Sequence, residues 1–487
     1  MNKGRLSQRV AKGGFWVFLL RAIQQLLNLG RLIILARILA PHDFGLMGIA
    51  LLTMAILETF SQTGFQQALI QKKGDIETYL DSAWTVLVLR GIALFAILFF
   101  VAPYAAMFFK VSAAALIIRV IGLSILFQSF TNIGVIYFQK ELEFNKQFVY
   151  QLSGVLTDFI VAVSAALILK SVWALVFGLV AGNFVRFIVS YLIHPYRPRL
   201  SRDLKKARGL FGFGKWVFGS SILIFLLTQG DDIFVGKLLG VTALGFYQMA
   251  YLISNIPATE ISHVISKVTF PAYSKIQDDL PKLKKAYLKV LQFTAFLSFP
   301  IAGLTFILAP DFTKIFLGEK WMPMVPAMQV LCIFGVTRAI NATTGPIFQG
   351  IGKPNISTVG SLVQLVIFIA IIYPLTYKWG ILGTSIAVII PNILFMLYVS
   401  KGLTKIMNYK LIILMRSLVV PIIGSTIMCT LIFFLKFKIW SQESLFSLLI
   451  FTLFGIAIYL TVIHIADKIF WQELISNSKQ FFSGRKV

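Results

Sequence analysis

Charged residues inside long apolar runs are the part of this sequence best suited to chemistry. Four arginines lie well within such runs: Arg21, Arg31, Arg119 and Arg338. The guanidinium group is planar and presents paired donors to phosphate or carboxylate oxygens. A charge surrounded by apolar sequence is costly in lipid, so it usually faces protein or a water-filled cavity. We therefore predict a cationic site that binds an anion.

Amide side chains accompany two of these arginines. Gln24, Gln25 and Asn28 lie between Arg21 and Arg31. At about 100° per residue these positions share one broad helical face. The pattern predicts a helix that lines a polar cavity. A second interpretation stays open, in which the amides only hydrogen-bond neighbouring helices.

Acidic residues are rarer in the apolar runs, and each needs a cation, water or a proton. The candidates are Glu58, Asp158, Asp231, Asp232 and Glu260. Two roles remain open: coupling or gating through a proton or a sodium ion, and permanent salt bridges between helices. Asp231 and Asp232 are the strongest candidates for the first role.

Other reactive residues favour structural roles. Arg90, Arg186, Lys267 and Arg416 lie nearer the ends of their runs, which favours snorkelling to the membrane interface. The two cysteines are expected to be packing residues. With four histidines and no H-E-x-x-H, Walker A or G-x-S-x-G motif, the sequence predicts no enzyme, no cofactor and no metal site.

The amino-acid composition indicates whether this chain folds in water or in a lipid membrane. Hydrophobic residues make up 58%, charged residues 13%, and the mean hydropathy is +0.84. These values exclude a water-soluble globule of 487 residues. Apolar runs of about 20 residues recur along the chain, which is the length needed to cross a bilayer as helix. We predict an integral membrane protein.

The runs predict an all-α polytopic fold with about 14 transmembrane helices. The predicted spans are 14–36, 45–69, 83–108, 112–137, 147–168, 172–193, 213–236, 245–268, 289–309, 325–348, 357–376, 380–400, 411–434 and 444–464. They form two six-helix lobes and two further helices. The predicted parts are an N-terminal lobe (1–195), a basic connector (196–212), a C-terminal lobe (213–402), the last helices (403–466) and a tail (467–487).

Basic residues predict the orientation. Most of the 45 Lys and Arg residues fall in loops on the same side as the N-terminus, including the stretch 197–215. Basic loops stay in the cytoplasm, so both termini are predicted to be cytoplasmic. The net charge of +26 has the same origin, together with attraction to anionic membrane lipids. No nucleic-acid module is visible.

An internal repeat relates the two lobes. Gly14 aligns with Gly214, Trp16 with Trp216 and Gly45 with Gly245 at a constant spacing. Because each lobe has an even number of spans, the repeats are parallel, and a cavity between such lobes suits a transporter. The same alignment matches Arg31 with Asp231. We predict that these opposite charges pair across the lobes and separate when an anionic cargo enters.

The chain resembles a known family at three segments: residues 35–52, 60–73 and, most specifically, "TQGDDIFVGKLLGVTALGFYQMAYLISNIP" at 228–257. These are similar to the polysaccharide transporter family, which includes Wzx-type exporters of O-antigen, lipopolysaccharide and colanic acid within the multidrug/oligosaccharidyl-lipid/polysaccharide superfamily. The resemblance covers essentially the whole chain. It implies a V-shaped cavity between two six-helix lobes.

The resemblance also implies an activity, flipping an undecaprenyl-diphosphate-linked oligosaccharide across the bacterial inner membrane. The partners would be this polyprenyl diphosphate glycan, membrane lipids, protons or sodium, and polysaccharide polymerase machinery. Two alternatives remain: a multidrug or metabolite antiporter of the same superfamily, which should have a more acidic cavity, and a membrane glycan polymerase or glycosyltransferase, which commonly needs a large outside loop or a cytosolic domain.

Reporter fusions test the predicted topology. A reporter inserted within 200–208 should respond as cytoplasmic, and one within 311–320 as external, because three predicted spans separate them. Protease protection or a compartment-sensitive reporter enzyme measures this. If both insertions respond from the same side, the predicted spans between them are wrong.

Overall fold

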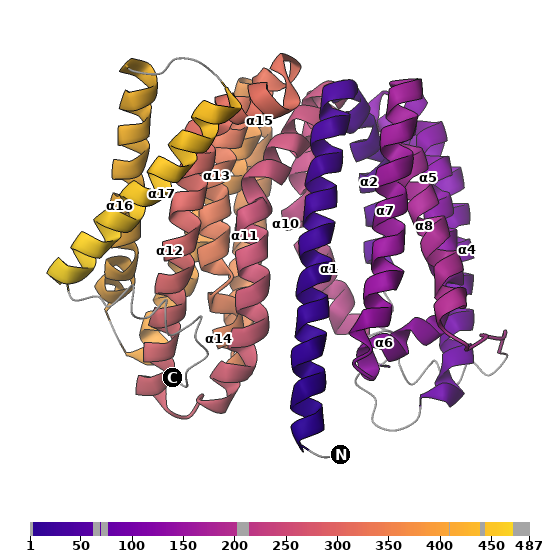
Figure 1. Ribbon diagram of the computed structural model, residues 1–487, viewed down its shortest axis with the longest axis horizontal. Helices are drawn as coiled ribbons and strands as arrows, with labels where there is room; N and C mark the ends of the chain where they lie inside the picture. Colours follow the sequence, from indigo (N-terminus) through magenta and orange to yellow (C-terminus); the bar gives the residue numbers. More distant parts are fainter. Residues whose placement is uncertain are drawn as a thin grey trace. The chain divides into compact units, whose positions relative to one another are not determined.

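The computed structural model describes residues 3–61, 69, 76–201, 214–408, 410–438 and 444–470. Nearly all of these residues are helical, and none of them forms a strand. The described part of the chain divides into two compact units, Met1–Gly245 and Phe246–Val487 (Figure 1). An all-α fold is therefore confirmed.

The first unit is a helical bundle. Its elements are α1 (Lys3–Ile38), α2 (Pro41–Phe60), α4 (Glu77–Phe109), α5 (Ala113–Phe130), η1 (Ile133–Val135), α6 (Ile136–Lys140), α7 (Phe144–Leu169), α8 (Trp173–Ile193) and α10 (Gly214–Leu238). Helix α11 (Val241–Lys275) begins in this unit and continues into the second. Helix α7 packs against α8 and α1, whereas α5 packs against α4, α8 and α2.

The second unit contains the remaining elements. They are α12 (Leu280–Phe312), the π-helix η2 (Thr313–Leu317), the 3₁₀-helix η3 (Glu319–Met324), α13 (Val325–Asn341), α14 (Thr344–Gly350), α15 (Asn355–Met407), α16 (Leu411–Lys438) and α17 (Leu445–Phe470). Helix α12 packs against α13, α16 and α17. The carboxylate of Asp311 on α12 also binds Lys436 of α16, which ties the C-terminal helices to the bundle.

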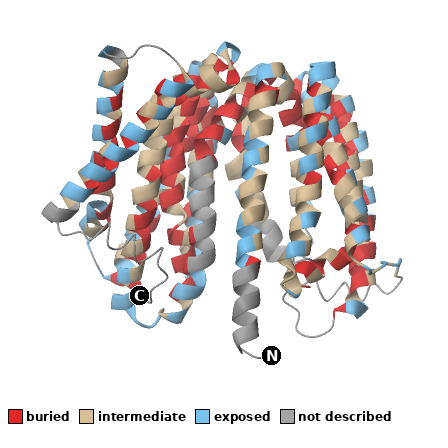
Figure 2. Cartoon of the chain, viewed as in Figure 1, coloured by how far each residue is buried: buried red, intermediate tan, exposed pale blue. Residues whose placement is uncertain are grey.

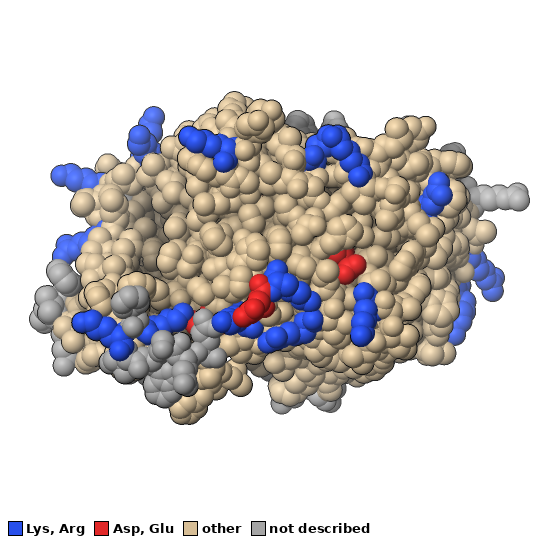
Figure 3. Space-filling model, turned by 90° about the horizontal axis from the view of Figure 1, so that it is seen from above, with Lys and Arg blue, Asp and Glu red and all other residues tan. Residues whose placement is uncertain are grey.

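The outer surfaces of the helices are apolar. Buried residues face the interior of each unit, and large apolar side chains remain on the outside (Figure 2). Phe18, Phe100, Met107 and Ile168 are each more than 70% exposed. Basic side chains occupy separate places on the face in Figure 3, with fewer acidic ones among them. Such a surface suits contact with lipid rather than water.

Among the described residues, eleven helices are long and apolar enough to cross a membrane. Helix α15 counts as one of them although its backbone is not helical at Gly380 (φ 58°, ψ −138°). The Thr376 and Thr384 hydroxyls lie 2.9 Å apart across this break. The sequence predicts the end of one span and the start of the next at this point. The count of about 14 stays a prediction.

Two helix boundaries differ from the predicted ones for identifiable reasons. Helix α2 starts at Pro41 rather than at 45, because proline suits the first helical turn and the Asp43 carboxylate accepts the Ala40 N–H at 2.9 Å. The predicted span 325–348 is interrupted, because α13 ends at Asn341 and α14 begins at Thr344. Pro346 therefore lies in a first turn and kinks no long helix.

The repeated segment contacts its own copy within the first unit. A Cβ at Gly45 of α2 would overlap the Val241 carbonyl oxygen, and a Cβ at Gly245 of α11 would overlap the Pro41 carbonyl oxygen. These four residues occupy equivalent positions in the repeat. The contact is therefore self-complementary, as in a two-fold interface. It accounts for glycine at the same place in both copies.

Alanine at Gly45 or Gly245 should destabilise the protein, because the added methyl group meets backbone that has little room to move. The expected cost is about 1–3 kcal/mol, the usual range for overpacking. Thermal unfolding of the detergent-purified protein measures it. Gly14→Ala is the control, since its Cβ would meet nothing within 4 Å. Equal melting temperatures for Gly45→Ala and Gly14→Ala would contradict the close contact.

Candidate functional site

An ion pair joins the first helix to α7. Arg31 Nη1 lies 3.1 Å from Asp158 Oδ2, and the two side chains are 23% and 19% exposed. The structure thus gives Arg31 a different partner from Asp231, the one predicted from the repeat. Arg31 Nε and Asp158 Oδ1 are buried and form no hydrogen bond within the described part of the chain.

Glycines let α8 approach this pair closely. A Cβ at Gly178 would lie 2.5 Å from Asp158 Oδ1, and one at Gly182 would lie 3.0 Å from Asp158 Cβ. On the facing side, a Cβ at Gly154 of α7 would lie 2.7 Å from Arg186 Nε. Arg186 of α8 is therefore held against α7.

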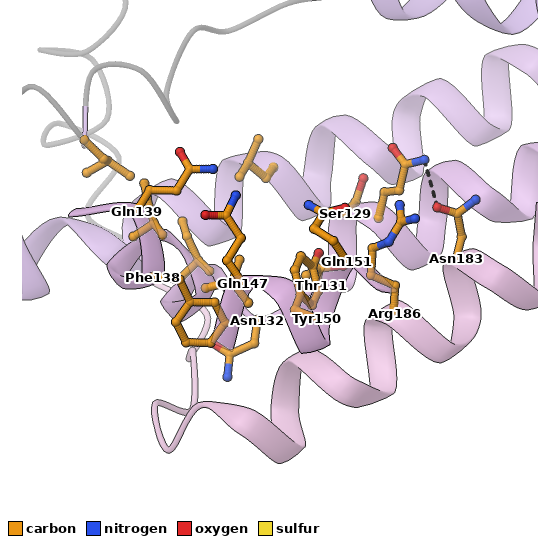
Figure 4. A pocket seen from close by; sticks show the side chains of 16 residues that line it. Ser129, Thr131, Asn132, Phe138, Gln139, Gln147, Tyr150, Gln151, Asn183 and Arg186 are labelled. Carbon is orange, nitrogen blue, oxygen red and sulfur yellow. Dashed lines mark hydrogen bonds between the residues drawn. The ribbon is translucent and has the colours of Figure 1, made fainter. Parts of the chain in front are cut away.

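Arg186 also lines a polar pocket of about 350 Å³ in the first unit (Figure 4). The pocket lies among η1, α6 and the adjoining ends of α5, α7 and α8. Its polar lining residues are Gln128, Ser129, Thr131, Asn132, Gln139, Gln147, Tyr150, Gln151, Asn183 and Arg186. No Asp or Glu occurs among the described residues that line it. The lining is thus rich in amides and hydroxyls and carries a positive charge.

Hydrogen bonds fix part of this lining. Gln128 Nε2 donates to Asn183 Oδ1 at 3.2 Å, which joins α5 to α8 (Figure 4). Asn132 is fully buried, and its Nδ2 donates to the Tyr196 carbonyl oxygen at 2.7 Å. In contrast, Arg186 Nε and Gln147 Oε1 are buried without a hydrogen-bond partner among the described residues. The pocket therefore has a fixed frame and unused polar atoms.

The segment after α8 contacts the pocket frame at Asn132, whose Nδ2 donates to the Tyr196 carbonyl oxygen. It begins the predicted basic connector, and its described part packs on α4, where the Tyr196 hydroxyl donates to Asp81 Oδ1 at 2.7 Å. Burial and the Asp81 carboxylate raise the pKa of Tyr196. The ring of His194 stacks on Tyr137. Burial, followed by the positive charge of Lys146, lowers the pKa of His194, which favours its neutral form.

The pocket lies at the end of the unit where α1 starts. The ring centroids of Trp16 on α1 and Phe148 on α7 are 5.1 Å apart. Figure 1 shows α6 and the N-terminus at the same end of this unit. The sequence predicts that this end faces the cytoplasm.

Helix α1 also carries the other polar residues that the sequence predicts to bind the cargo. Arg21 and Gln24 are partly exposed, and Gln25 and Asn28 are exposed. Large apolar side chains of α1 such as Leu26 are exposed as well, so the polar face and its part in binding stay predictions.

Arg119 and Arg338 each contact a neighbouring helix. Arg119 Nε donates to the Phe99 carbonyl oxygen of α4 at 3.2 Å, and its guanidinium lies 4.5 Å from the centre of the Phe99 ring. Arg338 Nη1 hydrogen-bonds the Tyr251 hydroxyl at 3.1 Å. Neither residue lines the polar pocket in the described part of the chain.

The remaining acidic candidates differ in their surroundings. Asp231 is buried at 3% exposure, and Asp232 is partly exposed. Glu58 is partly exposed at the end of α2, where Arg90 donates to the Ser61 carbonyl oxygen at 2.7 Å. Arg90 thus holds the end of a helix rather than reaching for the interface. The side chain of Glu260 lies outside the described residues.

Sequence reasoning missed the role of Arg186, which it assigned to the membrane interface. It also singled out none of the pocket amides. The sequence does contain a pattern that indicates the pocket, because Gln128 and Asn183 each interrupt an apolar run. Polar residues within membrane helices usually face protein or a cavity.

A second cavity, of about 440 Å³, lies in the second unit between α12, α13, α15 and α16. Its lining includes the apolar side chains Phe299, Phe306, Ile333, Val336, Ile340, Met396, Leu418 and Ile422. Cys332 and Cys429 also line it, and both are free thiols. The cavity suits an apolar chain rather than a sugar.

The fold and its apolar helices define a multi-pass membrane protein. A family model described as "Polysaccharide biosynthesis protein" matches residues 34–326, so the chain belongs to that family. Its relatives include the lipopolysaccharide biosynthesis protein WzxC of Escherichia coli K12, which is 26% identical over 80% of each chain. The teichuronic acid biosynthesis protein TuaB of Bacillus subtilis is 25% identical over 60% of this chain and 61% of its own length.

Solved structures show where this fold occurs. The lipid II flippase MurJ, in an inward closed conformation, matches with a TM-score of 0.75 at 16% identity, covering 94% of this chain and 99% of MurJ. An inward-facing multidrug resistance transporter of the MATE family matches with a TM-score of 0.59 at 18% identity, covering 79% of this chain and 94% of its own. At these identities the likeness shows the fold alone.

Arg31→Ala should destabilise the protein by about 1–3 kcal/mol, because it leaves the half-buried Asp158 carboxylate without its ion pair. Adding Asp158→Asn to Arg31→Ala should recover part of the loss, since the amide carries no charge. Thermal unfolding of the two single variants and the double variant measures the coupling. Strictly additive losses would contradict the ion pair.

Proposed function

We propose that this protein is a flippase that moves a lipid-linked oligosaccharide across the bacterial cytoplasmic membrane. Its membership of the polysaccharide biosynthesis family supports this function, as do the relatives WzxC and TuaB. The fold shared with the lipid II flippase MurJ gives a structural basis. We place the protein among transporters rather than enzymes.

The observation that carries the proposal is the polar pocket of the first unit. It offers amides, hydroxyls and the cation of Arg186, and no carboxylate occurs among the described residues that line it. The glycan of a polyprenyl-diphosphate carrier is rich in hydroxyl groups, which such side chains hydrogen-bond.

The diphosphate is assigned to the first helix. Arg21 and Arg31 lie on α1 with Gln24, Gln25 and Asn28, and guanidinium forks suit phosphate oxygens. In this proposal a diphosphate competes with Asp158 for Arg31, so cargo binding loosens a contact between α1 and α7. Such a contact gives two states whose balance the cargo shifts.

The remaining assignments belong to the same proposal. The cycle would alternate the exposure of the site between the two sides of the membrane, with both termini in the cytoplasm. Asp231 and Asp232 would supply a proton or sodium site for coupling. Polysaccharide polymerase machinery would receive the exported unit.

An antiporter of drugs or metabolites shares this fold, so the fold alone does not separate the two functions. The residues that line the pocket distinguish the two functions. A carrier of organic cations needs acidic groups to attract them, whereas the described lining of this pocket holds Arg186 and no carboxylate. The pocket chemistry therefore favours an anionic, sugar-bearing cargo.

Deleting the gene should cause lipid-linked oligosaccharide repeats to accumulate on the cytoplasmic leaflet, because they are still made but no longer exported. Mass spectrometry of lipid extracts measures the accumulation and identifies the cargo. A plasmid copy of the wild type should reverse it. Arg31→Lys should reverse it only in part, since lysine keeps the charge but loses the fork.

Protein level in the membrane is the control for each complementing variant. An unchanged level of lipid-linked repeat after deletion would overturn the flippase function. Accumulation of unpolymerised repeats on the external side would do the same, since export would then have occurred.

A further inference from the structure

We propose that the pocket around Arg186 binds a sugar residue carrying a carboxylate, the acidic sugar of the transported oligosaccharide. This inference rests on the proposed function and adds to it a substrate class and a site. It separates the recognition of the sugar from the attraction of the diphosphate by α1.

The charges around the pocket call for one negative charge. Arg186 is the one charged side chain among the described residues that line the pocket. A sugar carboxylate carries one negative charge and balances this guanidinium, whereas a diphosphate carries more than one. The charge count therefore favours a monoanionic ligand.

The polar atoms of the lining match a sugar. Gln147 Oε1 accepts hydrogen bonds and Arg186 Nε donates them, and both are buried without a partner among the described residues. Leaving such atoms unpaired is costly, which marks them as sites for a ligand or for water. Gln139, Gln151 and Asn183 add further amides (Figure 4). Sugar hydroxyls both donate and accept, as amides do.

The shape of the pocket is consistent with one or a few sugar residues. Its volume of about 350 Å³ is at the lower end of the range for small-molecule sites. Tyr150 and Phe138 place aromatic rings in the lining, which gives the apolar faces of a sugar a surface to contact.

Binding to the purified full-length protein in nanodiscs tests the proposal. The probes are methyl glucuronide, methyl glucoside and inorganic pyrophosphate, and calorimetry measures each affinity. Methyl glucuronide should bind at least about tenfold more tightly than methyl glucoside, because only the carboxylate forms a charge-assisted bond with Arg186. Arg186→Gln should remove this difference, and Arg186→Lys should keep part of it.

Arg416→Gln is the matched control, because Arg416 is an exposed arginine of a membrane helix that lines neither cavity. It should leave the preference for the glucuronide unchanged. If Arg186→Gln fails to fold, Gln151→Glu places a carboxylate in the pocket instead. That variant should weaken binding of the glucuronide and spare the glucoside.

Three results would overturn the site: no binding of either sugar, no preference for the glucuronide, or a preference that survives both Arg186→Gln and Gln151→Glu. Tighter binding of pyrophosphate that depends on Arg186 would also overturn it, by assigning the pocket to the diphosphate. These results concern the pocket alone. If the proposed flippase function is wrong, the gene deletion should cause no accumulation of lipid-linked repeat. That result is independent of how the two sugars bind.

Discussion

The ion pair between Arg31 and Asp158 determines much of the arrangement within the first unit. Neither charge is stable alone in an apolar bundle, so α1 and α7 must keep them together. Asp158 also faces α8, where Gly178 and Gly182 leave room for its carboxyl group and its backbone. The same close approach brings Arg186 against Gly154. The Asp158 carboxylate thus pairs with α1 and packs closely against α8.

The charge of Arg186 has consequences for function. Arg186 packs against Gly154 of α7 and lines a pocket of amides and hydroxyls. The second unit contains a cavity of opposite character, lined mainly by apolar side chains. A polar, anionic group suits the first cavity, and an apolar group suits the second.

Part of this fold follows from the sequence. Apolar runs of sufficient length predict membrane helices, and Gly380 interrupts α15 between two predicted spans. The glycines repeated at 45 and 245 allow α2 and α11 to approach closely, since a Cβ at either position would overlap backbone of the other helix. The sequence alignment shows that the two glycines are equivalent, but it does not show that they are in contact.

The pocket could not be predicted in the same way. Its lining comes from α4, α5, η1, α6, α7, α8 and Leu69, and only tertiary packing brings Gln128, Gln147 and Asn183 together. Arg186 lies near a helix end, where periodicity cannot distinguish snorkelling from a cavity. The partner of Arg31 was missed because the repeat matches it with Asp231, whereas Asp158 has no such relation in the sequence.

The most direct test of the central claim is flipping by the purified protein. The protein would be reconstituted into liposomes with lipid-linked oligosaccharide extracted from the deletion strain, and a membrane-impermeant glycosidase would report how much glycan reaches the outer leaflet. If the protein is a flippase, nearly all of the glycan should become accessible in liposomes with the protein, and about half without it. Equal accessibility in both, with protein that is folded and inserted, would contradict the flippase function.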